Sequence, residues 1–338
     1  MARLTQAIKN LTRLTSLSTR VLADIPFQAT AFVQRPPSYT VPAFAFLGAG
    51  YFGGGNDGSF VSGIDKILFP ADSKTTLSAT LTSARQGLAG MANSGVAGYF
   101  GGGYTGANVS GIDKITFPAD SKTTLSATLT SARRGLAGMA NSGTAGYFGG
   151  GYDGSYLSGI DKITFPADSK TTLSATLTAG GYQTAGMANS GVAGYFGGGD
   201  DGVGNLSRID KITFPADSKT TLSATLTTAR YFLAGMANSG VAGYFGGGND
   251  GARVSGIDKI TFPADSKTTL SATLTTARDG LAGMANSGVA GYFGGGEDSV
   301  GNISGIDKIA FPADSKTTLS ATLTTARVNF AGMADGAI

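Results

Sequence analysis

A seven-residue motif, Ala-Gly-Tyr-Phe-Gly-Gly-Gly, recurs along this chain and constrains its fold more than any other feature. Its six tyrosines are spaced 48, 48, 48, 49 and 48 residues apart: Tyr51, Tyr99, Tyr147, Tyr195, Tyr244 and Tyr292. A second motif, Ile-Asp-Lys-Ile, recurs with the same period, beginning at Ile64, Ile112, Ile160, Ile209, Ile257 and Ile306. This period is typical of propeller blades and is too long for most solenoid repeats. The repeats therefore predict a ring of similar units.

One repeat, residues 135–182, is compatible with four short strands joined by turns. Glycine and β-branched residues dominate it and no helical period runs through it, so helical repeats are disfavoured. Its turns are Asn-Ser-Gly and Pro-Ala-Asp-Ser. Residues 171–177 alternate Leu or Ala with Ser or Thr, the period-two pattern of a half-buried outer strand. The four predicted strands span residues 135–141, 144–150, 159–165 and 171–177.

The repeated region begins and ends with half a repeat. Residues 43–51 supply a second strand without a first, and residues 330–336 supply a first strand without a second. We therefore expect the C-terminal strand to pair beside the first blade, which closes the ring and removes the open sheet edge. The predicted fold is all-β, a six-bladed β-propeller of four-stranded blades over residues 43–338, preceded by an N-terminal helical and extended arm.

A longer block of the repeat resembles the kelch motif: Arg-x-Gly-Leu-Ala-Gly-Met-Ala-Asn-Ser-Gly-Val-Ala-Gly-Tyr-Phe-Gly-Gly-Gly. The resemblance covers roughly residues 43–338. The chain departs from kelch repeats in having no Trp, which kelch blades typically carry in the fourth strand. The resemblance implies a propeller of four-stranded blades.

The residue types that are missing exclude most catalytic chemistry. The chain has no Cys and no His, so it has no disulfide, thiolate nucleophile, imidazole base or histidine-ligated metal. Asp-rich loops such as residues 56–58 and 200–202 lack a full set of spaced carboxylates, which favours Asx turns over calcium sites. The Asp of Ile-Asp-Lys-Ile is predicted to accept structural hydrogen bonds, with Arg85 and its counterparts beside it. We expect a protein that is not an enzyme and has no cofactor and no metal.

Residues 1–42 differ from the repeats in charge and pattern. They are basic, because Asp24 is the only acidic residue among several Arg and Lys residues. The blades are close to neutral in charge, so we expect no nucleic-acid partner. The spacing of apolar residues predicts an amphipathic helix whose apolar stripe consists of Leu4, Ile8, Leu11, Leu14 and Leu17. Arg13 and Arg20 are on the other side of this helix. A Pro-rich stretch, residues 25–42, follows. The arm is predicted to dock on a protein assembly, with homo-oligomerisation and membrane-surface contact as alternatives.

The repeats differ from one another mainly in two windows. The first follows the glycine run: residues 56–61, 104–109, 152–157, 200–206, 249–254 and 297–303. The second follows the Ala-Arg pair: residues 86, 134, 181–184, 231–232, 279 and 328–330. Successive connections of an up-and-down blade alternate between the two rims, so both windows are expected on one face and the unvarying turns on the other.

Residue type suggests that this variable face binds a ligand, because aromatic rings mixed with Gly, Ser, Asn and Asp are typical of recognition surfaces. The predicted ligand-binding residues are Phe60, Tyr104, Tyr152, Tyr156, Tyr182, Tyr231, Phe232, Phe330, Asp57, Asp153, Asp201, Asp250, Arg134 and Arg253. The alternative is that these loops vary without selection because little packing constrains them.

An arm followed by a rigid disc with one variable face resembles the layout of a bacteriophage tail fibre or another virion-surface protein. This layout predicts a recognition module on the virion surface or tail that contacts assembly proteins through residues 1–42 and a host-envelope glycan or protein through the variable face. The alternative is a structural decoration protein of a virion or cell surface with inert loops. No apolar run approaches the ~20 residues of a membrane span, and no signal peptide is recognised.

Overall fold

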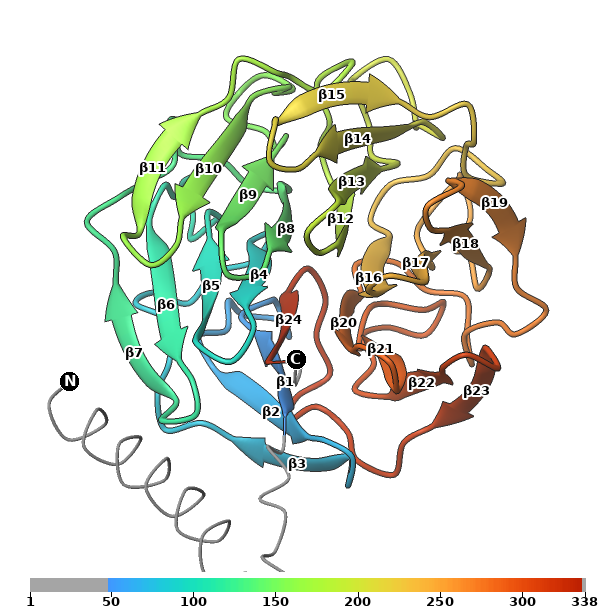
Figure 1. The fold of residues 1–338 in the computed structure, drawn as a ribbon. Helices are drawn as coiled ribbons and strands as arrows, with labels where there is room; N and C mark the ends of the chain where they lie inside the picture. Colours follow the sequence, from blue (N-terminus) through green and yellow to red (C-terminus); the bar gives the residue numbers. More distant parts are fainter. Residues whose placement is uncertain (1–47, 336–338) are drawn as a thin grey trace, which may run out of the picture. The chain divides into compact units, whose positions relative to one another are not determined.

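A computed structural model describes residues 48–335 as six four-stranded antiparallel sheets, or blades, arranged around an axis (Figure 1). Blade 1 has the strand order β24-β1-β2-β3, and blades 2 to 6 contain β4–β7, β8–β11, β12–β15, β16–β19 and β20–β23. Each blade has its first strand nearest the axis and its fourth strand at the rim (Figure 1). The predicted six-bladed propeller is confirmed.

The same sequences form the same strands in every blade. The inner strands are β24 (Ala331–Asp335), β4 (Ala89–Asn93), β8 (Ala137–Asn141), β12 (Ala185–Asn189), β16 (Ala234–Asn238) and β20 (Ala282–Asn286). The second strands are β1 (Ala49–Gly53), β5 (Ala97–Gly101), β9 (Ala145–Gly149), β13 (Ala193–Gly197), β17 (Ala242–Gly246) and β21 (Ala290–Gly294). The third strands are β2 (Ile64–Leu68), β6 (Ile112–Thr116), β10 (Ile160–Thr164), β14 (Ile209–Thr213), β18 (Ile257–Thr261) and β22 (Ile306–Ala310). The outer strands are β3 (Ser73–Thr76), β7 (Ser121–Thr124), β11 (Ser169–Thr172), β15 (Ser218–Thr221), β19 (Ser266–Thr269) and β23 (Ser315–Thr318).

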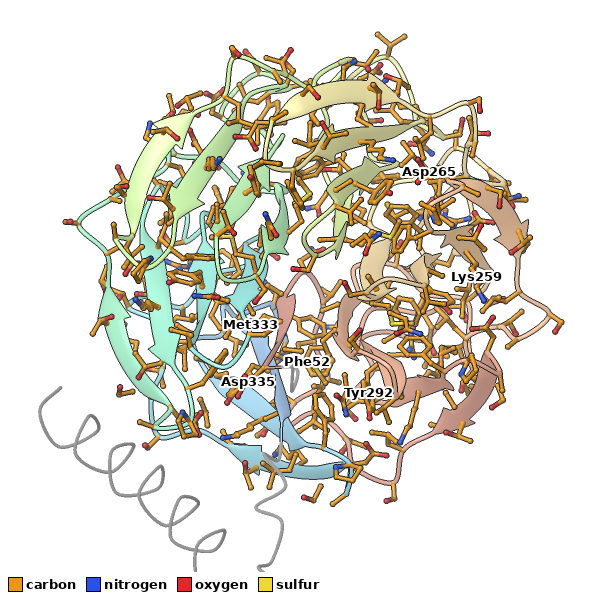
Figure 2. The ribbon with its side chains drawn as sticks, viewed as in Figure 1. Phe52, Lys259, Asp265, Tyr292, Met333 and Asp335 are labelled. Atoms are coloured by element: carbon orange, nitrogen blue, oxygen red, sulfur yellow. The ribbon has the colours of Figure 1, made fainter. Side chains whose placement is uncertain are left out.

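The ring closes between the two ends of the repeated region. Strand β24 pairs antiparallel with β1, and Tyr51 lies opposite Met333 while Ala49 lies opposite Asp335. Figure 2 shows Met333, Asp335 and Phe52 together on these two strands. The predicted pairing of the C-terminal strand with the first blade is confirmed, and it covers an edge of β1 that would otherwise be open.

The predicted position of the outer strand, residues 171–177, is wrong. Strand β11 covers residues 169–172, because the Pro-Ala-Asp-Ser turn is tighter than expected and Ser169 already pairs with Thr164. Asp168 turns the chain with a φ of 54° and donates its backbone N–H to the Thr164 carbonyl at 2.8 Å. Residues 173–177 follow β11 but do not pair as a strand. Their alternating pattern reflects the burial of side chains such as Leu177, which lies in the core, and not strand pairing. The first three strands of this blade are also shorter than predicted.

The hydrophobic core lies between adjacent blades. In one of six equivalent clusters, Met91 and Tyr99 of blade 2 pack with Phe148, Ile163 and Phe165 of blade 3. The Tyr99 ring stacks on Phe165 with their centroids 5.1 Å apart. Its hydroxyl donates to Asp168 at 2.7 Å, and the Lys114 ammonium donates to the same carboxylate at 2.6 Å.

We call each such Tyr, Lys and Asp set an inter-blade clasp. The six clasps run around the whole ring: Tyr51, Lys66 and Asp120; Tyr99, Lys114 and Asp168; Tyr147, Lys162 and Asp217; Tyr195, Lys211 and Asp265; Tyr244, Lys259 and Asp314; Tyr292, Lys308 and Asp72. Blade 6 therefore holds blade 1 as every other blade holds its neighbour.

The inner strands approach one another so closely that glycine is required at their second position. A Cβ added to Gly138 would lie 2.3 Å from the Gly90 carbonyl oxygen of the neighbouring blade. No other residue fits at this distance without moving backbone, so the Ala-Gly-Met strand sequence sets how tightly the ring can close.

Candidate recognition face

The variable windows of neighbouring repeats are joined by backbone hydrogen bonds on one face. Arg134, which precedes blade 3, exchanges backbone bonds of 3.1 and 2.8 Å with Tyr152. Tyr152 in turn forms a β-bridge with Tyr156 across the loop that joins β9 to β10. We call such a bridged set a station.

Each of the six blades carries one station. The stations are Val328, Asn56 and Phe60; Gln86, Tyr104 and Asn108; Arg134, Tyr152 and Tyr156; Tyr182, Asp200 and Asn205; Tyr231, Asn249 and Arg253; and Asp279, Glu297 and Asn302. Their bridges are the same although the side chains differ. The loops of blades 4 and 6 are one residue longer than the other four but keep the same pattern of bridges. Side chains therefore vary while the bridges are retained, which is how a recognition surface changes specificity without losing its shape.

Seven aromatic side chains of the variable windows lie over blades 1 to 5 in two groups of packed rings. We call this set the aromatic band: Phe60, Tyr104, Tyr152, Tyr156, Tyr182, Tyr231 and Phe232. Neighbouring ring centroids are 4.7 Å (Tyr231–Phe232) to 6.4 Å (Tyr156–Tyr182) apart. Arg134 joins its two parts, because its guanidinium lies 4.6 Å from the Tyr104 centroid and 5.5 Å from that of Tyr152.

Mutual packing makes the aromatic band less exposed than the sequence suggested. Tyr156 is 39% exposed and the other six rings are half-buried. Rings that already pack against one another lose little rotamer freedom when a ligand binds, which favours affinity.

The stations of blades 4 and 6 carry acidic side chains, namely Asp200, Asp279 and Glu297. Arg253 lies beside two of them and donates to Glu297 at 2.7 Å, with Asp279 at 3.6 Å. The predicted Asp residues hold their own loops: each carboxylate accepts a backbone N–H two residues ahead at Asp57, Asp153, Asp201 and Asp250. They are Asx turns, as the sequence favoured. No group of three or more potential metal ligands occurs within residues 48–335.

Phe330 was predicted on the variable face, and that prediction is wrong. It is 5% exposed and packs against Phe52 with their ring centroids 5.6 Å apart. It occupies the position that Leu88, Leu136 and their counterparts hold in other repeats. The change from Leu to Phe is therefore a core substitution, which sequence variation alone could not distinguish from a surface one.

A ring of backbone hydrogen bonds surrounds the axis of the variable face. Residue 87 donates to residue 329, and the series continues through residues 280, 232, 183 and 135 back to residue 87, with N···O distances of 2.7 to 3.2 Å. All six residues have positive φ, and three of them are glycine: Gly87, Gly135 and Gly280. The other three are Gln183, Phe232 and Asn329, with φ of 54°, 56° and 57°.

A pocket of about 340 Å³ opens at this axial ring. It is lined by Gln86, Gly87, Tyr104, Arg134, Tyr182, Gln183 and Asn329. Three of these residues, Gln86, Gln183 and Asn329, were not among the predicted ligand-binding residues. The sequence does distinguish two of them, because Gln183 and Asn329 stand where other repeats have the glycine of Arg-x-Gly-Leu.

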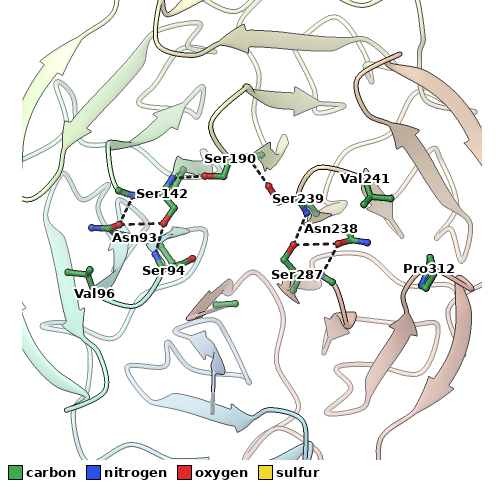
Figure 3. Close-up of a pocket in the computed structure, with 18 of the residues that line it drawn as sticks. Asn93, Ser94, Val96, Ser142, Ser190, Asn238, Ser239, Val241, Ser287 and Pro312 are labelled. Carbon is green, nitrogen blue, oxygen red and sulfur yellow. Dashed lines mark hydrogen bonds between the residues drawn. The ribbon is translucent and has the colours of Figure 1, made fainter. Parts of the chain in front are cut away.

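The opposite face carries the unvarying turns around a larger cavity of about 1060 Å³ (Figure 3). Four of its serine hydroxyls already have partners: those of Ser142, Ser190, Ser239 and Ser287 each accept from the backbone N–H of a preceding turn at 2.9 to 3.0 Å. Gly48 and Asp335 are the first and last described residues. The Gly48 carbonyl accepts from the Phe69 N–H, and Asp335 lies opposite Ala49, so both residues lie on this face. Gly48, the first described residue, therefore lies on the face opposite the stations.

The fold defines a six-bladed β-propeller with one constant and one variable face. Neither the known protein-family models nor the curated proteins gave a match to this chain. The predicted docking residues Leu4, Ile8, Leu11, Arg13, Leu14, Leu17 and Arg20 lie outside the described residues. Within residues 48–335 there is no helix of the length and apolar character needed to span a membrane.

Proposed function

We propose that this chain is a non-enzymatic recognition module of the kelch type, displayed on a larger assembly such as a phage tail or virion surface. Its variable face binds a glycan or protein of the host envelope, and residues 1–42 dock on the assembly. The observation that carries this proposal is the aromatic band, two groups of rings joined by Arg134 and built only from residues that differ between otherwise near-identical repeats.

Unselected variation is a poor explanation for the aromatic band. Exposed loops that vary freely are expected to gain polar residues, since a large apolar side chain gains little at an unpacked surface. Here seven rings from three separate loops and two blade-to-blade connections form two groups, which Arg134 joins. Such preformed aromatic surfaces bind sugar rings or anchor residues of a protein partner.

The position of Gly48 on the constant face supports display. Because the chain reaches β1 on the constant face, an assembly that holds residues 1–42 leaves the stations free of the covalent link. The clasps and the closed ring keep the face rigid, so recognition needs little ordering on binding.

The test is binding of the full chain to host cells and to a glycan array. Tyr152→Ala combined with Tyr156→Ala should weaken binding roughly tenfold or more, because a truncated aromatic anchor typically costs about 2 kcal/mol or more. The matched control is Val192→Ser with Val241→Ser, two exposed residues of the constant face, which should leave binding unchanged.

The proposal fails if the chain binds neither cells nor glycans, or if the tyrosine variant binds as well as the wild type. Absent binding combined with loss of particle incorporation after deletion of residues 1–42 would instead support the decoration role.

A further inference from the structure

Arg134 is singular among the basic residues of the propeller. Every other Lys and Arg of residues 48–335 has a carboxylate oxygen within 4.0 Å. Arg134 instead lies over Tyr104 and Tyr152 at the edge of the axial pocket. A guanidinium presents five N–H donors in a planar fork, so this one faces the pocket with its hydrogen-bonding capacity largely unused.

The rest of the pocket lining is also built from groups that bind polar ligands. Gln86, Gln183 and Asn329 contribute carboxamides, and Tyr104 and Tyr182 contribute rings. The Asn329 Oδ1 atom is buried and has no hydrogen-bond partner within the described chain. A buried acceptor without a partner costs free energy, and a hydroxyl or N–H of a ligand would satisfy it.

Backbone conformation gives independent support. Gln183 and Asn329 occupy positive-φ positions at which Gly87, Gly135 and Gly280 stand in other repeats. A residue with a Cβ is strained there, and such strain concentrates at functional sites. The repeat itself shows that glycine suffices for the ring of backbone bonds, so the two side chains serve something other than the fold.

We propose that the axial pocket binds a carboxylate-bearing sugar residue, such as a uronic acid, of the glycan that the variable face recognises. The inference rests on the proposed function. Arg134 pairs with the sugar carboxylate, Asn329 accepts from a sugar hydroxyl, and Tyr104 and Tyr182 flank the sugar ring. A volume of about 340 Å³ is within the range of small-ligand pockets.

The charge distribution favours a singly charged sugar over a phosphorylated one. One guanidinium in the pocket can neutralise one carboxylate in bidentate geometry. The acidic side chains of blades 4 to 6 include Asp200, Asp279 and Glu297 of the stations, and they disfavour a ligand with more negative charge.

The experiment compares an array of carboxylate-bearing glycans with the same glycans after reduction of the carboxyl to an alcohol, using the full chain. Wild type should bind at least one acidic glycan roughly tenfold or more tightly than its reduced counterpart, the range expected for a charge-assisted bond. Arg134→Gln should remove that preference. Lys219→Gln, which removes a paired basic side chain of the outer strand β15 outside the stations and the pocket, should keep it.

A second pair of variants separates binding from folding. Gln183→Gly and Asn329→Gly restore the residue found in other repeats, so the thermal midpoint should stay the same or rise while affinity for the acidic glycan falls. Relief of backbone strain offsets the greater freedom of glycine in the unfolded chain. Loss of stability without loss of affinity would overturn the assignment of these side chains to the ligand.

Equal binding of acidic and reduced glycans, or tighter binding of their phosphorylated or sulfated analogues, would overturn the proposal. If Tyr152→Ala with Tyr156→Ala weakens host-cell binding while Arg134→Gln does not, the carboxylate site is wrong and the recognition function stands. If no variant affects binding to cells or glycans, the recognition function itself is wrong.

Discussion

At the scale of the residue, a buried carboxylate organises each blade. Asp113 is 1% exposed and accepts from the Thr82 amide at 3.0 Å, from the Thr124 hydroxyl at 2.9 Å and from the Arg85 guanidinium at 3.1 Å. Burial alone raises the pKa of Asp113, but the hydrogen bonds from Thr82 and the charge of Arg85 outweigh it and lower the pKa below its usual value. The predicted structural role of this Asp is confirmed.

Blade 4 shows how the arrangement tolerates change. Gly181 stands where other repeats have the arginine, and Arg208 replaces a glycine elsewhere in the same repeat. The Arg208 Nε atom lies 3.8 Å from the Asp210 carboxylate, which keeps its bonds from the Thr178 amide and hydroxyl. The missing arginine at Gly181 and the additional arginine at Arg208 therefore concern the same carboxylate, that of Asp210.

We predict that Arg230→Met destabilises the protein far more than Arg208→Gly. Arg230 is 2% exposed and holds Asp258 at 3.1 Å, so its loss leaves a buried charge unpaired and should cost about 3–5 kcal/mol. Arg208 is partly exposed and more distant, so its loss should cost under about 1 kcal/mol. Urea unfolding of both variants checks this. Equal costs would show that the buried pair adds little.

At the scale of the element, the second strand of one blade is tied to the turn of the next by the inter-blade clasp. The sequence marked Tyr99 as part of the scaffold, and no local pattern indicated that its hydroxyl binds Asp168, 69 residues further along. The partner lies in a different blade, so the contact exists only once two blades are packed. The Asp of the turn thus has two roles, since it also adopts the positive φ that reverses the chain.

Alkaline solution is expected to weaken the ring through these clasps. Burial, with the hydrogen bond to and the charge of Asp168, raises the pKa of Tyr99 above its usual 10.0, and the five counterparts behave alike. Above pH 10 the unfolded chain loses these protons first, so the free energy of unfolding stays level below pH 10 and falls as pH rises further. Urea midpoints measured with tyrosinate absorbance between about pH 8 and pH 12 check this.

Tyr147→Phe provides the control for this pH dependence. This variant lacks one ionisable hydroxyl of a clasp, so it should be less stable than the wild type at neutral pH. Its free energy of unfolding should also fall less steeply as the pH rises above 10. A midpoint that does not change with pH would contradict the role of the clasps.

At the scale of the whole molecule, closure decides stability. The eight C-terminal residues contribute only β24 to the described chain, yet that strand completes blade 1 and contacts the inner strands of blades 2 and 6. Without it, β1 becomes an open edge and the clusters around Tyr51 and Ala282 lose a wall.

Deletion of residues 331–338 should therefore remove about 5 kcal/mol or more of the free energy of unfolding, a large part of what a domain possesses. Thermal unfolding followed by circular dichroism and by light scattering measures both the loss and the expected aggregation through β1. Deletion of residues 336–338, which spares β24, is the control and should behave as the wild type. A fully stable truncated chain would show that the ring does not need closure.

The sequence by itself determined the number of blades, the closure of the ring and the division into a constant and a variable face, because all three follow from period and chain order. Tertiary structure alone decided which variable residues act together. Phe330 lies in the core, and the outer strand covers residues 169–172. Arg134 lies over two tyrosine rings at the edge of the axial pocket. A repeat compared with itself identifies the positions that change, but contacts between blades depend on how six sheets pack around an axis, which no single repeat contains.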